Sequence, residues 1–159
     1  AGTDLWIVPL FGERKPIPFT RTGEFFEGHA QLSPDGHWIA YTSNETGREE
    51  VYVQNFPQPG GKWQVSTGGG AEPRWRRDGK ELFYLEGQKL MAAEVRSGSH
   101  GFEAGTPKAL FGVRLAGTGL RNRYLASADG QRFLLNSPAE ESGSAPFTVV
   151  VNWAAAPRK

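Results

Sequence analysis

Short apolar runs, each only a few residues long, alternate along the chain with glycine, proline and polar residues. Three of these runs, at residues 38–41, 82–84 and 133–135, each closely follow an Asp-Gly pair. No window shows the 3.6-residue spacing of an amphipathic helix. The pattern therefore predicts many short β-strands joined by turns.

The Asp-Gly pairs mark an internal repeat. Asp35, Asp78 and Asp129 lie 43 and then 51 positions apart, and repeats of roughly 40–50 residues with four strands each are typical of β-propeller blades. Because the second interval is longer, we expect a loop-like insertion at residues 97–101. Glycine accepts a positive φ and aspartate bonds its own backbone, so each pair is predicted to form a tight two-residue hairpin between strands A and B of a blade.

Two further strands are predicted in each repeat. Third strands are expected at 50–54, 89–95 and 147–153, with a similar segment at 4–8, and fourth strands at 16–20, 63–66 and 108–111. Prolines 16 and 18 fit an outer edge strand, which tolerates a missing amide donor. The predicted fold class is all-β, a propeller fragment of about three to four four-stranded antiparallel blades. The predicted units are a partial blade at 1–27 and blades at 28–70, 71–115 and 116–159.

This blade count lies below the four to eight of a closed propeller. An open end would expose an apolar blade face, which soluble proteins avoid unless a partner covers it. We therefore expect a homo-oligomer that completes a propeller ring, or the loss of an N-terminal part present in the natural protein. The start at Ala1 is interpreted as the cut end of a longer chain.

One stretch resembles a known family. The run Ser33-Pro34-Asp35-Gly36-x-x-Ile39-Ala40-Tyr41, followed by Gly47-x-x-x-Val51-Tyr52-Val53, resembles the TolB-like, WD-repeat-like propeller repeat. The whole chain resembles the C-terminal propeller of bacterial serine/threonine kinases. The other two repeats depart from the motif: Arg77 and Ala128 replace its proline, and Leu135 replaces its tyrosine.

The resemblance implies a non-catalytic sensor or protein-interaction module that binds a protein or peptide and forms the C-terminal part of a bacterial signalling kinase. Two alternatives stay open. One is the gating propeller segment of a prolyl-oligopeptidase-type serine peptidase, and the other is an isolated propeller fragment that self-assembles. Fold alone does not choose between these contexts.

Charge and composition narrow the classes of partner. With 18 basic and 17 acidic side chains, the chain lacks the basic excess of nucleic-acid-binding proteins, and no apolar run is long enough to span a membrane. The absence of cysteine excludes disulfides and thiolate sites and fits reducing and oxidising compartments alike. The densest basic cluster, residues 74–77, is interpreted as a solvated strand face. Within it, Arg74, Trp75 and Arg76 are our candidates for partner binding, since Trp and Arg often anchor interfaces.

No residue pattern predicts catalysis, a cofactor or a metal site. His29, His37 and His100 lack zinc-site spacing, and His29 and His37 are expected at the surface. The three repeat aspartates are expected to form turns, while the pairs 49–50 and 140–141 are expected to be solvated glutamates. Residues 68–70 lack the lysine of a phosphate-binding loop. The aromatic residues of strand B are predicted to form the blade core: Trp38, Tyr41, Phe83, Tyr84 and Phe133.

Overall fold

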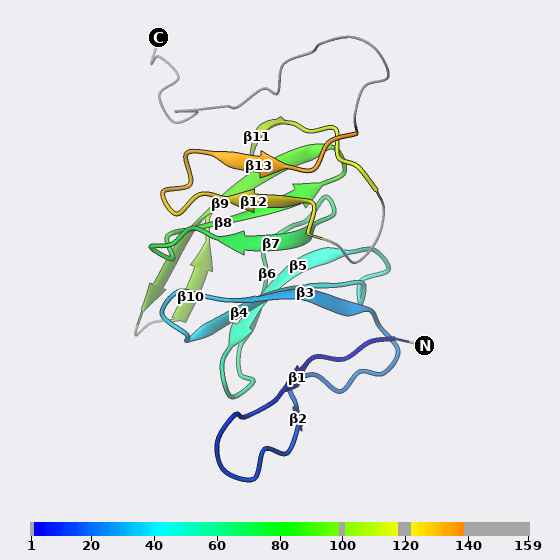
Figure 1. The fold of residues 1–159 in the computed structure, drawn as a ribbon, viewed down its shortest axis with the longest axis vertical. Coiled ribbons are helices and arrows are strands. Elements are labelled where there is room, and N and C mark those ends of the chain that lie inside the picture. Colours follow the sequence, from blue (N-terminus) through cyan, green and yellow to red (C-terminus); the bar gives the residue numbers. More distant parts are fainter. Residues whose placement is uncertain (1, 99–100, 118–121, 139–159) are drawn as a thin grey trace.

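A computed structural model describes residues 2–98, 101–117 and 122–138 of the chain. These residues form β-strands and turns with no helix, so they include no candidate for a membrane-spanning helix. Successive antiparallel sheets follow one another along the long axis of the molecule (Figure 1). The predicted all-β class is confirmed.

The first complete sheet has the predicted order of four consecutive strands. It contains β3 (Glu27–Leu32), β4 (Trp38–Ser43), β5 (Glu50–Asn55) and β6 (Lys62–Gln64), each paired with the next. Every residue of β4 is buried, and Trp38 and Ala40 of this strand belong to the apolar cluster that joins the two complete sheets.

The second sheet repeats this order and adds a strand. β7 (Ala71–Trp75), β8 (Glu81–Glu86), β9 (Lys89–Gly98) and β11 (Lys108–Gly112) pair in succession, and β10 (Gly101–Ala104) pairs with the far end of β9. The loop predicted at 97–101 is therefore wrong, because residues 97 and 98 lie in β9 and residue 101 lies in β10. The insertion lengthens β9 and adds β10, because Phe102 on β10 is buried against Trp38 and Trp63.

Shorter sheets lie at the two ends of the described chain. The antiparallel pair β1 (Trp6–Ile7) and β2 (Ile17–Pro18) precedes the complete sheets, and the pair β12 (Tyr124–Ala126) and β13 (Phe133–Leu135) follows them. These four strands were predicted. The strand predicted at 147–153 lies outside the described residues.

Each Asp-Gly pair joins the first strand of a sheet to the second, as predicted, but the loop is longer than two residues. Ser33 N donates to Trp38 O, so residues 34–37 form a four-residue loop. The same closure recurs from Arg76 to Glu81 and from Ser127 to Arg132. In each loop it is the glycine, and not the aspartate, that has positive φ: 73° at Gly36, 72° at Gly79 and 70° at Gly130.

The aspartate bonds its own backbone, as expected. Asp35 Oδ1 accepts hydrogen bonds from His37 N, at 3.1 Å, and from Ser33 Oγ, at 2.5 Å. Asp78 and Asp129 likewise accept from the backbone nitrogen two residues ahead. The carboxylate therefore holds the loop in place through a hydrogen bond to the backbone two residues ahead.

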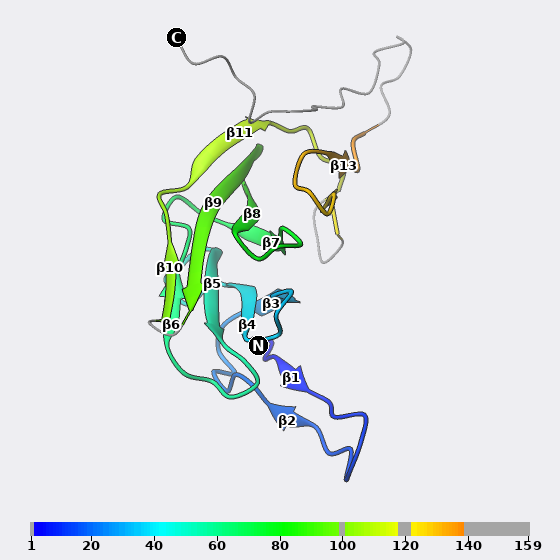
Figure 2. The ribbon, with the colours of Figure 1, turned by 90° about the vertical axis from the view of Figure 1, so that its left-hand side faces the viewer.

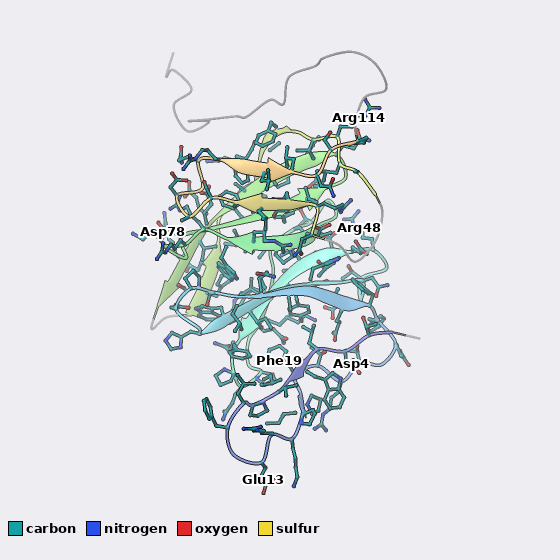
Figure 3. The ribbon with its side chains drawn as sticks, viewed as in Figure 1. Asp4, Glu13, Phe19, Arg48, Asp78 and Arg114 are labelled. Carbon is teal, nitrogen blue, oxygen red and sulfur yellow. The ribbon has the colours of Figure 1, made fainter. Side chains whose placement is uncertain are left out.

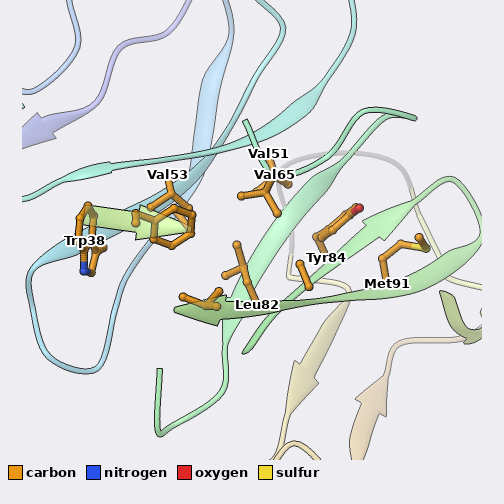
Figure 4. Close-up of a cluster of buried hydrophobic side chains, with 11 residues drawn as sticks. Trp38, Val51, Val53, Val65, Leu82, Tyr84 and Met91 are labelled. Carbon is orange, nitrogen blue, oxygen red and sulfur yellow. The ribbon is translucent and has the colours of Figure 1, made fainter. Parts of the chain in front are cut away.

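The sheets pack face to face through two apolar clusters. One joins the first complete sheet, through Trp38, Val51 and Val53, to Leu82 and Tyr84 of the second (Figure 4). The other joins the opposite face of the second sheet to β12 and β13. Burial confirms the predicted aromatic core of strand B: Trp38, Tyr41, Phe83, Tyr84 and Phe133.

Candidate functional site

Three polar residues occupy one equivalent position in the repeats. His29, Glu72 and Arg123 each lie six residues before the aspartate of the Asp-Gly loop. His29 lies in β3 and Glu72 in β7, while Arg123 directly precedes β12. These are the first strands of successive sheets, and β7 contacts both of the others. In Figure 2, β3 and β7 lie away from the side of the molecule that carries β6 and β10. The three residues therefore meet where the inner strands converge.

The backbone at two of these positions is strained. His29 has φ 55° and Glu72 has φ 54°, a left-handed conformation that is uncommon for residues other than glycine. Each lies in a β-bulge, where the register shifts between Gly28 and Gln31 in β3 and between Ala71 and Arg74 in β7. A β-bulge changes the direction in which a side chain points. Here the two bulges contain His29 and Glu72, the residues whose side chains gather in this cluster.

Glu72 is the centre of the cluster. Its side chain is fully buried, with 0% exposed, and its Oε1 lies 2.5 Å from Arg123 Nε. Its Oε2 accepts a second hydrogen bond, of 2.9 Å, from Arg123 N. The Glu72 backbone is fixed as well, since Glu72 N donates to Thr42 Oγ1 and Tyr124 Oη donates to Glu72 O. This single residue therefore links β4, β7 and β12.

His29 lies beside this pair in a half-buried position. Its Nδ1 is 3.4 Å from Thr42 Oγ1, and its Nε2 is buried with no hydrogen-bond partner among the described residues. Burial lowers the pKa of His29, an effect that the nearby Glu72 carboxylate opposes. The expectation that His29 is a surface group is wrong, because the bulge in β3 turns its ring inward.

The predicted partner-binding residues already make contacts within the protein. Arg74 is buried, and it donates to Pro73 O and to Asn122 Oδ1 while lying over the Tyr124 ring at 5.6 Å. The interpretation of this segment as a solvated strand face is therefore wrong for Arg74. The basic side chain is buried because acceptors and an aromatic face surround its guanidinium.

The next two residues are only partly covered. Trp75 Nε1 donates to Gln31 O, and its ring packs edge-on against Phe102. Arg76 pairs with Asp78 at 2.7 Å and with Glu81 at 2.9 Å, and 25% of its side chain stays exposed. The hydrogen bond with Arg76 lowers the pKa of Asp78. Their binding of a partner stays a prediction.

Several buried carboxylates were missed or misplaced by the sequence interpretation. Glu50, expected to be a solvated charge, is buried: it accepts from Ser66 Oγ, from Gly69 N and from Arg48 Nε. Glu72 could have been found from its fixed distance to Asp78. His37 is exposed, as expected, while His100 and the glutamates at 140–141 lie outside the described residues.

A shallow cavity lies near the loop end of the first complete sheet. It is open to solvent, and its lining comes from the first loop, from the end of β5 and from the extended end of β9: Asp35, His37, Trp38, Asn55, Phe56, Ser97 and Gly98. Among the described residues no three metal-binding side chains lie together. The polar groups that do gather, around Glu72, bind one another and so act as a link between strands.

Comparison with known proteins identifies the fold. No family model and no curated protein matches the sequence. Among solved structures, oligogalacturonate lyase from Vibrio parahaemolyticus aligns with 82% of this chain at a TM-score of 0.55 and 13% identity. TolB from Acinetobacter baumannii aligns with 76% of it at a TM-score of 0.51 and 18% identity.

Both neighbours are propellers, and the chain has a TolB-like propeller fold. The aligned part makes up 35% of the lyase chain and 28% of the TolB chain. The chain thus spans about a third of each neighbour's length or less. At these identities the likeness concerns the fold alone.

Proposed function

We propose that this chain is a non-catalytic protein-interaction segment of a propeller, part of the C-terminal sensor module of a bacterial signalling kinase. The observation that carries the proposal is how the chain uses its charged residues. Asp35, Asp78 and Asp129 fix hairpin loops, and Glu72 links three strands. These groups build the scaffold, and the repeated blades present a surface.

A protein or peptide is the class of partner that such a surface suits. Trp75 and Arg76 are half-buried at the end of β7, beside the Asp-Gly loop of their sheet. A rigid aromatic ring and a planar guanidinium held by neighbours lose little side-chain freedom on binding. The preceding residue, Arg74, is held in place by a hydrogen bond that it donates to Asn122 Oδ1.

The coding region on either side of these residues tests the kinase context. A protein kinase domain encoded upstream supports the proposal. A hydrolase domain with a nucleophile-elbow motif encoded downstream would contradict it and would favour the gating propeller of a peptidase.

Activity measurements test the non-catalytic role. In a full-length kinase that carries this propeller, deletion of residues 1–159 is expected to leave phosphorylation of a generic substrate, myelin basic protein, within about two-fold of the intact enzyme, because the proposed module contributes no reacting group. Loss of phosphorylation from a truncated enzyme that keeps its folded kinase domain would show that the propeller takes part in the reaction.

A further inference from the structure

The contact between the N-terminal strand pair β1–β2 and the first complete sheet contains little apolar packing. Neither of the two apolar clusters described above includes a residue of β1 or β2. The rings of Phe19 and Phe56 lie with their centroids 6.0 Å apart, and the strand pair projects from the end of the molecule below β3 (Figure 1). The contact therefore depends to a large extent on polar groups.

Glu27, the first residue of β3, lies at this junction. Its backbone nitrogen donates to Thr3 O at 3.0 Å and to Thr3 Oγ1 at 3.2 Å, and Thr3 Oγ1 donates to Glu27 O at 2.9 Å. Figure 3 shows the side chains of Asp4 and Phe19, from the segments that adjoin β1 and β2, close to the first complete sheet. The backbone of Glu27 thus connects β3 to the segment that leads into β1.

The Glu27 side chain is buried without a hydrogen-bond partner. Only 3% of the residue is exposed, and among the described residues neither Oε1 nor Oε2 accepts a hydrogen bond. An ionised carboxylate in such a place loses its hydration with no bond to replace it, whereas a neutral carboxylic acid has a much smaller burial penalty. The described residues themselves cover both oxygens, so this property does not depend on any other part of the chain.

A second carboxylate on the same sheet provides a contrast. The register places Ser43 opposite Glu27 in β3 and opposite Glu50 in β5. Glu50 is equally buried, but it accepts from Ser66 Oγ and pairs with Arg48 at 2.6 Å. The sheet can thus satisfy a buried carboxylate, and Glu27 is the exception.

The nearby cation is bound to other groups. Lys62, on β6, pairs with Glu45 instead of Glu27. Its Nζ lies 4.4 Å from the centroid of the Tyr52 ring and 5.7 Å from that of Tyr41. Burial raises the pKa of both tyrosines, so neither adds a charge near neutral pH. No group on β4, β5 or β6 therefore neutralises Glu27 by direct contact among the described residues.

The electrostatic surroundings favour the protonated form of Glu27. Burial raises the pKa of this carboxyl, and the charges of Asp4 and Glu45 add to the effect. The Thr20 hydroxyl and Lys62 oppose it, although neither forms a hydrogen bond with the carboxyl oxygens. Groups from the strand pair and from the sheet thus both act on the same proton.

We propose that Glu27 is a proton-controlled switch in the contact between β1–β2 and the first complete sheet. The contact is tight while Glu27 is a neutral carboxylic acid, and it opens locally when the proton leaves for solvent and the carboxylate becomes hydrated. The strand pair is the part that moves, because it lies outside the apolar clusters that join the other sheets. The switch is separate from the proposed function and does not depend on the kinase context.

The direction of the pH effect follows from linkage between protonation and opening. Because the pKa of Glu27 is raised above 4.5 in the folded chain, the closed state binds more protons than the opened state at pH values above 4.5. The contribution of Glu27 is therefore fully present below pH 4.5 and is lost as the pH rises through the folded pKa. His29 acts in the opposite direction, since burial lowers its pKa.

Hydrogen exchange of the 159-residue chain tests the switch. The amides of Thr3 and of residue 27 report on the contact, because they donate to Phe25 O and Thr3 O. Their protection factors, measured against the exchange rates of an unfolded chain, are expected to fall between pH 4.5 and about pH 8, while those of β8 and β9 stay constant.

A neutral side chain of the same shape should abolish this pH dependence. Glu27→Gln is expected to keep both amides protected over the whole range. Glu24→Gln, at an exposed position three residues earlier, is the matched control and is expected to behave like the unchanged chain. Loss of protection with pH in Glu27→Gln, or constant protection in the unchanged chain, would overturn the proposal.

An NMR titration of the Glu27 carboxyl carbon provides a second readout. Its midpoint is expected to lie above 4.5. Each unit of difference corresponds to about a ten-fold loss of protection at high pH, so the midpoint and the exchange data have to agree. A midpoint at or below 4.5 would contradict the switch.

Added calcium separates a proton from a metal ion as the species that neutralises Glu27. No three metal-binding side chains lie together in the described part of the chain, so calcium chloride at constant ionic strength is expected to restore no protection at high pH. Recovery that Glu27→Gln does not show would identify a cation site, and the proton switch would fail. A hydrolase domain encoded downstream would remove the kinase context and leave these results standing, so the two proposals fail separately.

Discussion

At the residue scale, the repeat position six residues before each Asp-Gly pair carries three different side chains that lie close to one another. His29, Glu72 and Arg123 are equivalent in sequence, yet Glu72 is an acceptor, Arg123 its donor and His29 a neutral neighbour. A repeat with identical residues at this position would place like charges side by side, which is destabilising. The difference in side chain at this position therefore allows the first strands of neighbouring sheets to lie side by side without repulsion between like charges.

Loss of the Glu72 carboxylate should destabilise the fold. Glu72→Gln leaves Arg123 without its counter-ion in a partly buried site, and we expect a loss of about 2–3 kcal/mol, below the full value for a buried pair because Arg123 is partly exposed. Urea denaturation measures it. Glu94→Gln breaks an exposed pair with Lys108 and is expected to cost less than about 1 kcal/mol. Equal effects would contradict the central role of Glu72.

His29 should make stability depend on pH. Because burial lowers its pKa below 6.5, the unfolded chain binds more protons than the folded chain once the pH falls below that value, so stability is lost on acidification. His29→Asn keeps a residue that tolerates positive φ and should flatten the stability profile between about pH 7 and pH 5. His37→Asn, at an exposed position, controls for loss of an imidazole. An unchanged profile in His29→Asn would rule out this source.

At the element scale, the hairpin loops show what local sequence determines. The position of each loop follows from glycine, which supplies the positive φ at Gly36, Gly79 and Gly130. The length of the loop does not follow, because it depends on hydrogen bonds to the aspartate from Ser33, Arg76 or Ser127. These donors lie outside the Asp-Gly pair.

Removal of one loop carboxylate should have a modest effect. Asp35→Ala loses the acceptor for His37 N and Ser33 Oγ, and we expect a cost of about 1 kcal/mol in the free energy of unfolding. Asp35→Asn keeps an acceptor oxygen and should cost clearly less. Thermal or urea unfolding of the two variants checks this, and a larger loss in Asp35→Asn would contradict the assigned role.

Long-range contacts explain what the sequence could not predict. The burial of Glu72 depends on Arg123, 51 residues away, and that of Arg74 on Asn122. The strand β10 was missed because its glycine-flanked segment has loop-like composition, and it is held by Phe102 packing against residues of another sheet. Strand positions were predictable because the repeat fixes them against the Asp-Gly pairs.

At the scale of the whole molecule, the structure is an open stack of equivalent sheets. Two interfaces between the described sheets are closed by apolar clusters, whereas the strand pairs β1–β2 and β12–β13 expose Trp6, Ile17, Leu125 and Leu134. Packing between successive sheets is therefore what holds the described residues together.

Amide hydrogen exchange of the 159-residue chain tests this packing most directly. The amides of β4, β5, β8 and β9 are expected to exchange most slowly, because side chains of these strands fill the clusters between the sheets. Exchange in these strands as fast as in the Asp-Gly loops would contradict the claim that the sheets are packed face to face.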